Sequence, residues 1–355
     1  MVNFDRAPFL VIWEGTQACD LACVHCRACA EPQRHPLELT TDEGFGLLEQ
    51  IKECGGPLMV FTGGDPLKRA DIFNLLEKSV SLGLRTTITP SATSLLTAET
   101  IQRFRECCVA RMAVSVDGPT AAIHDGFRGV SGSFARTIFA LEEARRTGLE
   151  TQVNTTVTRH NRAHLEEIAG MVAEYGARLW SVFFLVATGR AVASQDLTAG
   201  ETEEVFEFLY RTSKTAPFDI KTTEAQHYRR YVAQRRKAEG AGRVVNGRPG
   251  GPILRQAGIN DGKGFVFISH TGEIFPRGFL PLSAGNIRRD SLIDVYRNAP
   301  LFVRLRNSDL LGGKCGACEF RNLCGGSRSR SYALVGDFMA EEPRCVYQPV
   351  PVAVV

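Results

Sequence analysis

Short apolar runs alternate with amphipathic stretches over the first half of the chain. Six of these runs have the β-branched and aromatic residues of buried strands, and they lie at 9–13, 58–62, 84–89, 110–116, 151–157 and 179–186. Between them, apolar residues recur at helical spacing near 41–54, 70–82, 97–107, 133–147 and 161–175. Helical crossovers join parallel strands that are buried on both faces. The pattern therefore predicts an α/β fold, a partial (β/α)6 TIM-like barrel that binds ligands at the C-terminal ends of its strands.

The alternation changes after residue 190. A helix is predicted at 199–213, and a glycine-rich stretch at 239–264 is a candidate loop or lid, because long irregular segments in compact proteins are usually functional or disordered. A strand-turn-strand at 265–276, two short helices and a cysteine-rich segment at 315–345 follow. We therefore predict a barrel, a helical and glycine-rich bridging region and a C-terminal domain, with boundaries at 1–195, 196–264 and 265–355.

Composition limits the partners and the compartment. The 355 residues carry a formal charge of +3 without long charged runs, so nucleic acid is not an expected partner. No apolar run reaches the ~20 residues that span a bilayer, and the start lacks the pattern of a signal peptide. We expect a cytoplasmic protein with no membrane partner. Eleven cysteines in such a reducing compartment favour metal binding or catalysis over disulfides.

Three cysteines stand directly behind the first predicted strand. Cys19, Cys23 and Cys26 have the spacing C-x3-C-x2-C, which places three thiolates around one metal centre and leaves one position open. A structural zinc site normally has four protein ligands, whereas an iron–sulfur cluster on three cysteines leaves one iron free for a ligand. His25 or Cys29 could complete a zinc site, so zinc stays open as an alternative.

This segment resembles the cluster motif of the radical S-adenosylmethionine superfamily. The resemblance implies a 4Fe–4S cluster on the three cysteines, with S-adenosylmethionine chelated to the free iron. Reductive cleavage of this cofactor would give a 5′-deoxyadenosyl radical that abstracts a hydrogen atom from substrate. An electron donor such as flavodoxin or ferredoxin is implied as a partner. The family motif has an aromatic residue before its last cysteine, and His25 at that position is assigned a packing role.

The resemblance also extends to the predicted strand ends. "FTGGDP" at 61–66 is similar to the family's "GGE" motif, with Asp in place of Glu, and "SVDGP" at 115–119 matches a position that binds the ribose and the carboxylate of the cofactor. Both segments are also ordinary turn signals. The implied cofactor contacts are Gly63, Gly64, Asp65, Ser115, Asp117, Asn154 and, near the adenine, Leu185.

A second cysteine set lies near the C-terminus. Its members are Cys315, Cys318 and Cys324, with spacing C-x2-C-x5-C, and Cys345. Four thiolates make a closed site, and the spacing alone fits a zinc ribbon and an iron–sulfur cluster comparably well. The segment resembles the SPASM domain of radical enzymes, which implies an auxiliary 4Fe–4S cluster on these four cysteines.

The full SPASM pattern holds two auxiliary clusters, and this chain departs from it. Arg277 and Arg328 stand where two further cysteines are expected, and no cysteine lies in the 25 residues before Gly272. We therefore expect the first auxiliary cluster to be absent and the second to be complete. The prediction is two clusters in total, one on each cysteine set.

The segment "IKTTEAQHYRRY" at 220–231 offers candidate substrate residues. Treated as one helix, it places Glu224, His227 and Arg230 on one face at i, i+3 spacing, with Lys221 nearby. Such a set suits the binding of a carboxylate. A solvated charged helix face is the alternative.

Within the superfamily, residues 8–346 look most like the branch associated with haem and haem d1 biosynthesis and with small-molecule decarboxylases. This implies hydrogen abstraction beside a carboxylated carbon, followed by decarboxylation of a tetrapyrrole side chain or a sugar acid. The main alternative is a peptide maturase with a SPASM domain, although no precursor-binding domain is expected before the first strand near residue 9. A non-catalytic electron carrier or zinc module would not need such a polar-lined barrel.

Overall fold

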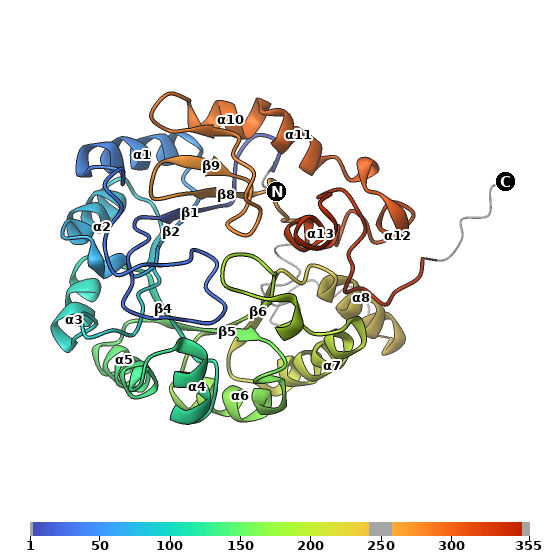
Figure 1. Cartoon of the computed structure of the whole chain (residues 1–355), viewed down its shortest axis with the longest axis horizontal. Helices are drawn as coiled ribbons and strands as arrows, with labels where there is room; N and C mark the ends of the chain where they lie inside the picture. Colours follow the sequence, from blue (N-terminus) through green and yellow to red (C-terminus); the bar gives the residue numbers. More distant parts are fainter. Residues whose placement is uncertain (1–2, 241–257, 350–355) are drawn as a thin grey trace.

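A single ten-stranded sheet organises the computed structural model, which describes residues 3–240 and 258–349. The order is β10-β9-β8-β1-β2-β3-β4-β5-β6-β7, and the pairs from β8 through β1 to β7 are parallel. Figure 1 shows the strands curving around the centre of the molecule. The strands are β1 (Leu10–Glu14), β2 (Leu58–Thr62), β3 (Thr86–Ile88), β4 (Arg111–Ser115), β5 (Thr151–Val157), β6 (Leu179–Phe184), β7 (Asp219–Thr223), β8 (Phe265–Ile268), β9 (Glu273–Phe275) and β10 (Gly285–Asn286).

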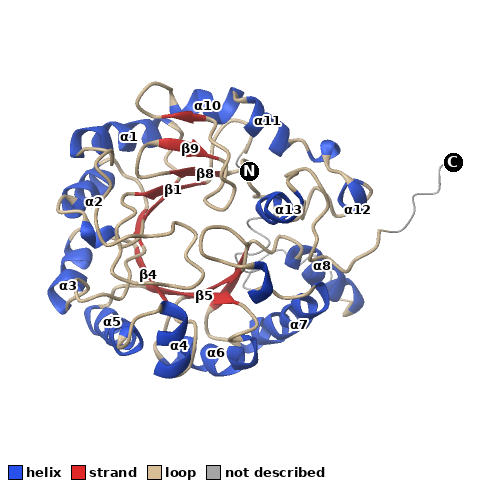
Figure 2. Cartoon of the chain, viewed as in Figure 1, coloured by secondary structure: helices blue, strands red, loops and turns tan. Residues whose placement is uncertain are grey.

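Helices form the outer layer of this barrel, as Figure 2 shows. The helices are α1 (Thr41–Glu53), α2 (Ile72–Ser81), α3 (Ala98–Glu106), α4 (Ala121–Arg128), α5 (Ser133–Thr147), α6 (Leu165–Glu174), α7 (Ala199–Thr215), α8 (Tyr228–Ala238), α10 (Leu292–Asn298), α11 (Pro300–Arg306), α12 (Gly313–Gly316) and α13 (Arg328–Val335). Apart from α4, the helices between strands β1 and β7 follow the predicted ones, and α13 lies nearer the centre of the view than the other C-terminal helices (Figure 2).

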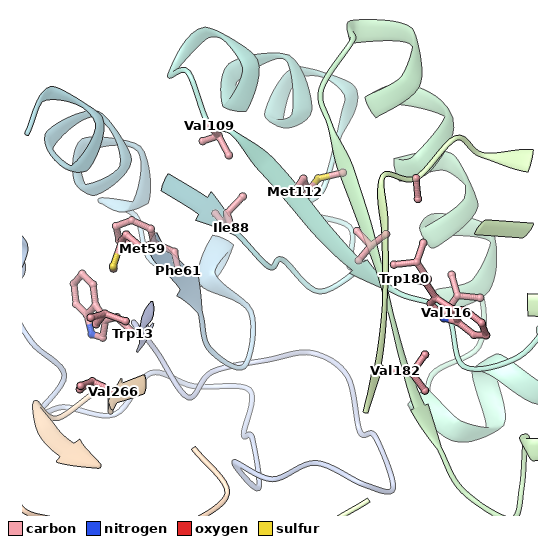
Figure 3. Packing of buried hydrophobic residues seen from close by; sticks show 14 of the residues in the cluster. Trp13, Met59, Phe61, Ile88, Val109, Met112, Val116, Trp180, Val182 and Val266 are labelled. Atoms are coloured by element: carbon pink, nitrogen blue, oxygen red, sulfur yellow. The ribbon is translucent and has the colours of Figure 1, made fainter. Parts of the chain in front are cut away.

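Alternation along the strands separates a structural face from a functional one. In β5, Val153, Thr155 and Val157 are buried, and the residues between them point into the barrel. The outward side chains pack between the sheet and the helices, and Figure 3 shows Phe61 and Trp180 among them. This core leaves the inward positions free for polar residues.

Capping signals explain where the long helices begin. Helices α1 and α7 both start with a capping box. The Thr40 side chain accepts a hydrogen bond from the Glu43 backbone, and the Thr198 side chain accepts one from the Glu201 backbone. In each case the glutamate side chain accepts from the backbone N–H of the threonine.

None of the described helices is long and apolar enough to cross a membrane.

The predicted fold class is confirmed, with two differences in detail. Helix α4 was not predicted, and the barrel repeat does not end near residue 190, because α7 leads into β7, which pairs in parallel with β6. The sheet therefore runs across the predicted boundaries at 195 and 264, and the three-part division stays a prediction. Most of the glycine-rich stretch, residues 241–257, lies outside the described residues.

Candidate active site

The first cysteine set lies on the loop between β1 and α1, which crosses the middle of the view in Figure 1. Its close packing against the end of β2 explains the paired glycines. The backbone N–H of Gly64 donates to the Thr16 carbonyl at 2.8 Å, and a Cβ on Gly63 or Gly64 would lie within 2.5 Å of a carbonyl of that loop. Gly63 and Gly64 are therefore required by close backbone approach, which no larger residue permits.

The surroundings of the three thiols fit an iron–sulfur cluster. The backbone N–H of Leu21 donates to the Sγ of Cys19 at 3.4 Å, and that of Ala30 donates to the Sγ of Cys26 at 3.4 Å. Hydrogen bonds of this kind stabilise thiolate ligands. Burial raises the pKa of Cys19 to about 11, so its thiolate needs a cationic partner such as iron.

No group of three or more His, Cys, Asp or Glu side chains among residues 3–240 and 258–349 is arranged to hold a single metal ion. A four-iron cluster spreads its cysteine ligands over separate irons.

His25, which was assigned a packing role, stacks on Phe127 with ring centroids 4.2 Å apart.

A large cavity lies inside the barrel, and its lining includes residues of the first cysteine loop. Its empty volume, which includes the space open to solvent at the mouth, is about 2040 Å³, and concave spaces of this kind are where small molecules bind. All three cysteines line it. Five of the seven predicted cofactor contacts line it as well, and these are Gly63, Gly64, Ser115, Asn154 and Leu185.

The other two predicted contacts lie behind the cavity wall. Asp65 is fully buried and accepts hydrogen bonds from Thr93 and from two backbone N–H groups, and burial raises its pKa to about 6. Asp117 is buried against the Arg128 guanidinium and accepts from the Thr156 backbone at 2.7 Å. Both side chains hold neighbouring loops in place instead of facing the cavity.

The two walls of the cavity differ in chemistry. Strands β1, β2 and β8 present only apolar side chains over most of their length: Leu10, Ile12, Leu58, Val60, Phe265 and Phe267. The wall from β3 to β7 carries hydroxyl, amide and cationic groups. In the described part of the chain the cavity lining holds six cationic side chains and no Asp or Glu: Arg27, Arg85, Arg111, Arg128, Lys221 and Arg277.

Lys221 is the predicted substrate residue that faces this cavity. It lies on β7, and no carboxylate pairs with it among the described residues. Desolvation and the nearby Arg277, Arg111 and Arg229 lower its pKa to about 8. An anionic ligand here would relieve this repulsion between cations.

Arg85 and Arg111, which were not predicted as site residues, also line the cavity; they stand just before β3 and at the start of β4. The signal was present, because Arg85, Thr87 and Thr89 stand two residues apart along the chain, as do Arg111, Ala113 and Ser115, and all six line the cavity. The predicted strands at 84–89 and 110–116 already contain both arginines, and applying the two-residue period within them places both on the inner face.

The second cysteine set surrounds a separate, smaller cavity with an empty volume of about 370 Å³. Cys315, Cys318, Cys324 and Cys345 all line it. The backbone N–H of Glu342 lies 3.3 Å from the Sγ of Cys315, and that of Gly326 lies 3.3 Å from the Sγ of Cys324. Four thiols around one cavity, with backbone donors aimed at sulfur, fit a cluster ligated only by cysteine.

The structure does not bring the other predicted substrate residues to the barrel cavity. Residues 220–231 are not one helix, because β7 ends at Thr223, Glu224 has φ +57° and α8 starts at Tyr228. Glu224 is buried and bonds to Arg277 at 2.6 Å and to Ser327 at 2.5 Å. These partners hold its unfavourable backbone conformation.

His227 and Arg230 line the cavity of the second cysteine set instead. Arg230 pairs with Glu203, and its Nη2 lies 3.9 Å from the Sγ of Cys345. His227 and Arg230, which were predicted to bind substrate, therefore lie beside the four cysteines.

Both positions at which further cysteines were expected carry buried, bonded arginines. Arg277 pairs with Glu224, and Arg328 donates to the carbonyls of Phe338 and Ala340 at 3.0 and 2.6 Å. These contacts give the two arginines structural partners where the full SPASM pattern has cluster ligands.

One buried arginine links the two cysteine sites. Glu342, whose backbone faces Cys315, pairs with Arg330 at 3.3 Å, and Arg330 donates to the Leu185 carbonyl at 3.1 Å. The loop of the second set is thereby joined to the end of β6, at the rim of the barrel cavity.

Comparisons with known proteins agree with this geometry. The model of the radical SAM superfamily matches residues 13–172. The AdoMet-dependent heme synthase of Oleidesulfovibrio alaskensis is 42% identical over 96% of this chain and 87% of its own length, and that of Methanosarcina barkeri is 38% identical over 98% and 99%. The pre-heme d1 synthase of Dinoroseobacter shibae is 27% identical over 95% and 85%.

Solved structures share the fold at low sequence identity. Streptococcus suis SuiB bound to S-adenosylmethionine superposes with a TM-score of 0.75 at 18% identity, covering 96% of this chain and 78% of that one. The structure of anSMEcpe with bound AdoMet and a peptide gives 0.68 at 15% identity, with 95% and 93% covered. The chain is thus a radical SAM enzyme of the branch that includes the haem-synthesis enzymes, and this family implies a 4Fe–4S cluster that binds S-adenosylmethionine.

Proposed function

We propose that this enzyme decarboxylates propionate side chains of an iron tetrapyrrole, as a haem synthase. The observation that carries the proposal is the barrel cavity, in which an apolar wall faces a polar wall with cationic side chains, and Arg85 and Lys221 there have no carboxylate partner among the described residues. A tetrapyrrole of this class is a flat apolar macrocycle with carboxylates on its rim. The apolar wall suits the macrocycle, and the cations suit the propionates. The relatives named heme synthase and Fe-coproporphyrin III synthase support the same substrate class.

The chain's own residues would bind and orient this substrate. Lys221 and Arg277 stand near each other at the side of the cavity where β7 and β8 face one another, and both also line a second small cavity there. Arg85 and Arg111 lie at the opposite end of the barrel from the cysteine loop, since they precede or begin their strands. Propionates that do not react would bind Lys221 and Arg85, which have no carboxylate partner among the described residues, and this leaves another propionate directed at the cysteines.

Conversion of a propionate to a vinyl group is an oxidative decarboxylation. A propionate that loses one hydrogen atom, CO2 and one electron becomes a vinyl group. The cofactor and the first cluster, when bound, supply the radical that takes the hydrogen atom. The electron needs an acceptor, which is the chemistry that a cluster on the four C-terminal cysteines would supply. The fully cysteine-ligated second site has no position for substrate and is suited to this role.

The test is conversion of iron-coproporphyrin III by anaerobically reconstituted enzyme with S-adenosylmethionine and a reductant, followed by mass spectrometry. Stepwise loss of CO2 with formation of 5′-deoxyadenosine is expected. If 5′-deoxyadenosine forms but no tetrapyrrole changes mass, the substrate assignment is wrong. The peptide-maturase alternative rests on relatives such as the mycofactocin maturase of Mycobacterium ulcerans, at 27% identity, and no contact in the cavity favours it.

A further inference from the structure

His227 is a buried polar residue without a hydrogen-bond partner. It lies between β7 and α8 and is 1% exposed. Neither ring nitrogen has a partner among the described residues, although the Arg344 backbone approaches the ring. An unsatisfied buried polar group costs ~1–3 kcal/mol, so such groups are rare in native proteins. The described residues therefore leave the imidazole N–H without an acceptor in hydrogen-bonding geometry, and the Arg344 carbonyl is the competing acceptor nearby.

The surroundings of the ring leave one further direction for an acceptor. Phe206 packs edge-on against the ring at 4.8 Å. The nearby Glu342 carboxylate already accepts from Ser327, Arg330 and Arg344. The remaining side of the ring faces the cavity that the four cysteines line.

The ring is suited to donate to sulfur. An imidazole carries one N–H when neutral and two when protonated, so the ring has a donor in either state. Backbone N–H groups already point at Cys315 and Cys324, and the Arg230 guanidinium approaches Cys345. His227 would add a side-chain donor to a site that is already built from donors.

We propose that the N–H of His227 donates a hydrogen bond to a sulfur of the cluster held by the four C-terminal cysteines and raises the reduction potential of that cluster. Hydrogen bonds to sulfur favour the reduced, more negative state of a cluster. The inference rests on the proposed function in one respect, because it assumes that these cysteines hold an iron–sulfur cluster. It assigns His227 to the tuning of that cluster, and not to substrate binding.

The experiment isolates the second cluster in full-length protein that carries Cys19/Cys23/Cys26→Ala. Two variants are added to this background. His227→Leu removes the donor, and His227→Gln replaces it with an amide N–H. A redox titration followed by electron paramagnetic resonance should give a more negative potential for His227→Leu, with most of the shift recovered in His227→Gln. Tyr228→Phe is the matched control, since Tyr228 is buried next to His227 but does not line the cavity.

Two outcomes would overturn the proposal, and they differ in what else they overturn. An unchanged or more positive potential in His227→Leu means that the ring donates elsewhere, for example to the Arg344 carbonyl, and leaves the cluster assignment intact. A background protein that holds no cluster removes the four-cysteine site as well. If His227→Leu fails to fold, pulsed resonance on the background protein with 15N-labelled histidine provides the test. A nitrogen and an exchangeable-proton coupling to the reduced cluster are expected, and their absence contradicts the proposal.

Discussion

The two cysteine sites differ in what can reach them. The first has three thiols at the mouth of a cavity with about 2040 Å³ of empty space, while the second has four thiols around about 370 Å³. Six cationic side chains line the first cavity, and two of them, Arg85 and Lys221, have no carboxylate partner among the described residues. The second cavity is lined by its own cysteines, aromatic rings and paired side chains. The number of thiols and the size of the space agree at each site. A cluster with an open ligand position can bind a cofactor or substrate, whereas a cluster ligated only by cysteine is suited to electron transfer.

The largest expected effect is loss of the open site. Cys19/Cys23/Cys26→Ala should abolish cleavage of S-adenosylmethionine to 5′-deoxyadenosine and lower iron from about eight to about four per chain. Cofactor cleavage and iron are measured on the same anaerobic preparation. Cys29→Ala is the control, since Cys29 is exposed on the same loop and does not line the cavity. Cleavage by the triple variant would contradict the assignment of the first site.

Loss of the closed site should separate two steps that the open site joins. Cys324→Ala is expected to keep cofactor cleavage within a few-fold but to lose formation of decarboxylated product, because the substrate radical then has no electron acceptor. Chromatography of 5′-deoxyadenosine and of tetrapyrrole products gives both quantities. Cys54→Ala, at a buried cysteine remote from either set, controls for loss of a thiol. Unimpaired product formation would show that the second site has no redox role.

Removing a cation from the open cavity should weaken substrate binding without touching the cysteines. Lys221→Met is expected to weaken binding of iron-coproporphyrin III by about 10-fold to 100-fold, because a charge-assisted hydrogen bond contributes ~1.5–3 kcal/mol. The change is measured by absorbance titration. Lys237→Met, on the last turn of α8, should have no effect. Equal affinity for wild type and Lys221→Met would remove Lys221 from the binding site.

Binding of the substrate carboxylate should also depend on pH, because Lys221 loses its charge in the accessible range. Lys221 is charged below its lowered pKa of about 8, so affinity for the carboxylate should fall as pH rises through about 8. A guanidinium stays charged over this range, so Lys221→Arg should bind with little change between pH 7 and 9. Titrations at a series of pH values provide the measurement. The same decline in both proteins would assign it to another group.

The smallest effect concerns a contact between the barrel and the segment that leads to the second site. Arg288 donates to Glu43 at 2.6 Å, which holds the pKa of Glu43 at about 2. Both side chains are about one-third exposed, so Glu43→Gln should cost only ~0.5 kcal/mol of stability at pH 7. A lowered carboxylate pKa stabilises the fold above about pH 4.5, and this is lost as pH falls toward 2. Unfolding at pH 7 and pH 4 should therefore give a smaller difference at pH 4, with Glu53→Gln unchanged.

The sequence predicted strands β1 to β6 because each is a compact apolar run between helical patterns. Strand β7 was missed because "DIKTT" has one apolar residue, Ile220, and its polar side chains face the cavity instead of a core. Spacing marked both cysteine sets as candidate metal sites, and the resemblance to the superfamily and to the SPASM domain predicted iron–sulfur clusters on them. Glu224 and His227 were assigned to substrate because a continuous helix was assumed, and the positive φ of Glu224 depends on distant partners, Arg277 and Ser327, which no local pattern reveals.

Strand β1 pairs with β2 on one side and with β8 on the other. During synthesis on the ribosome, β2 becomes available soon after β1, whereas β8 starts at Phe265, about 200 residues later. At ~5–20 residues per second, β1 remains an edge strand for roughly 10–40 s. The nascent chain thus carries the complete first cysteine loop during this interval, before β8 can close that side of the sheet.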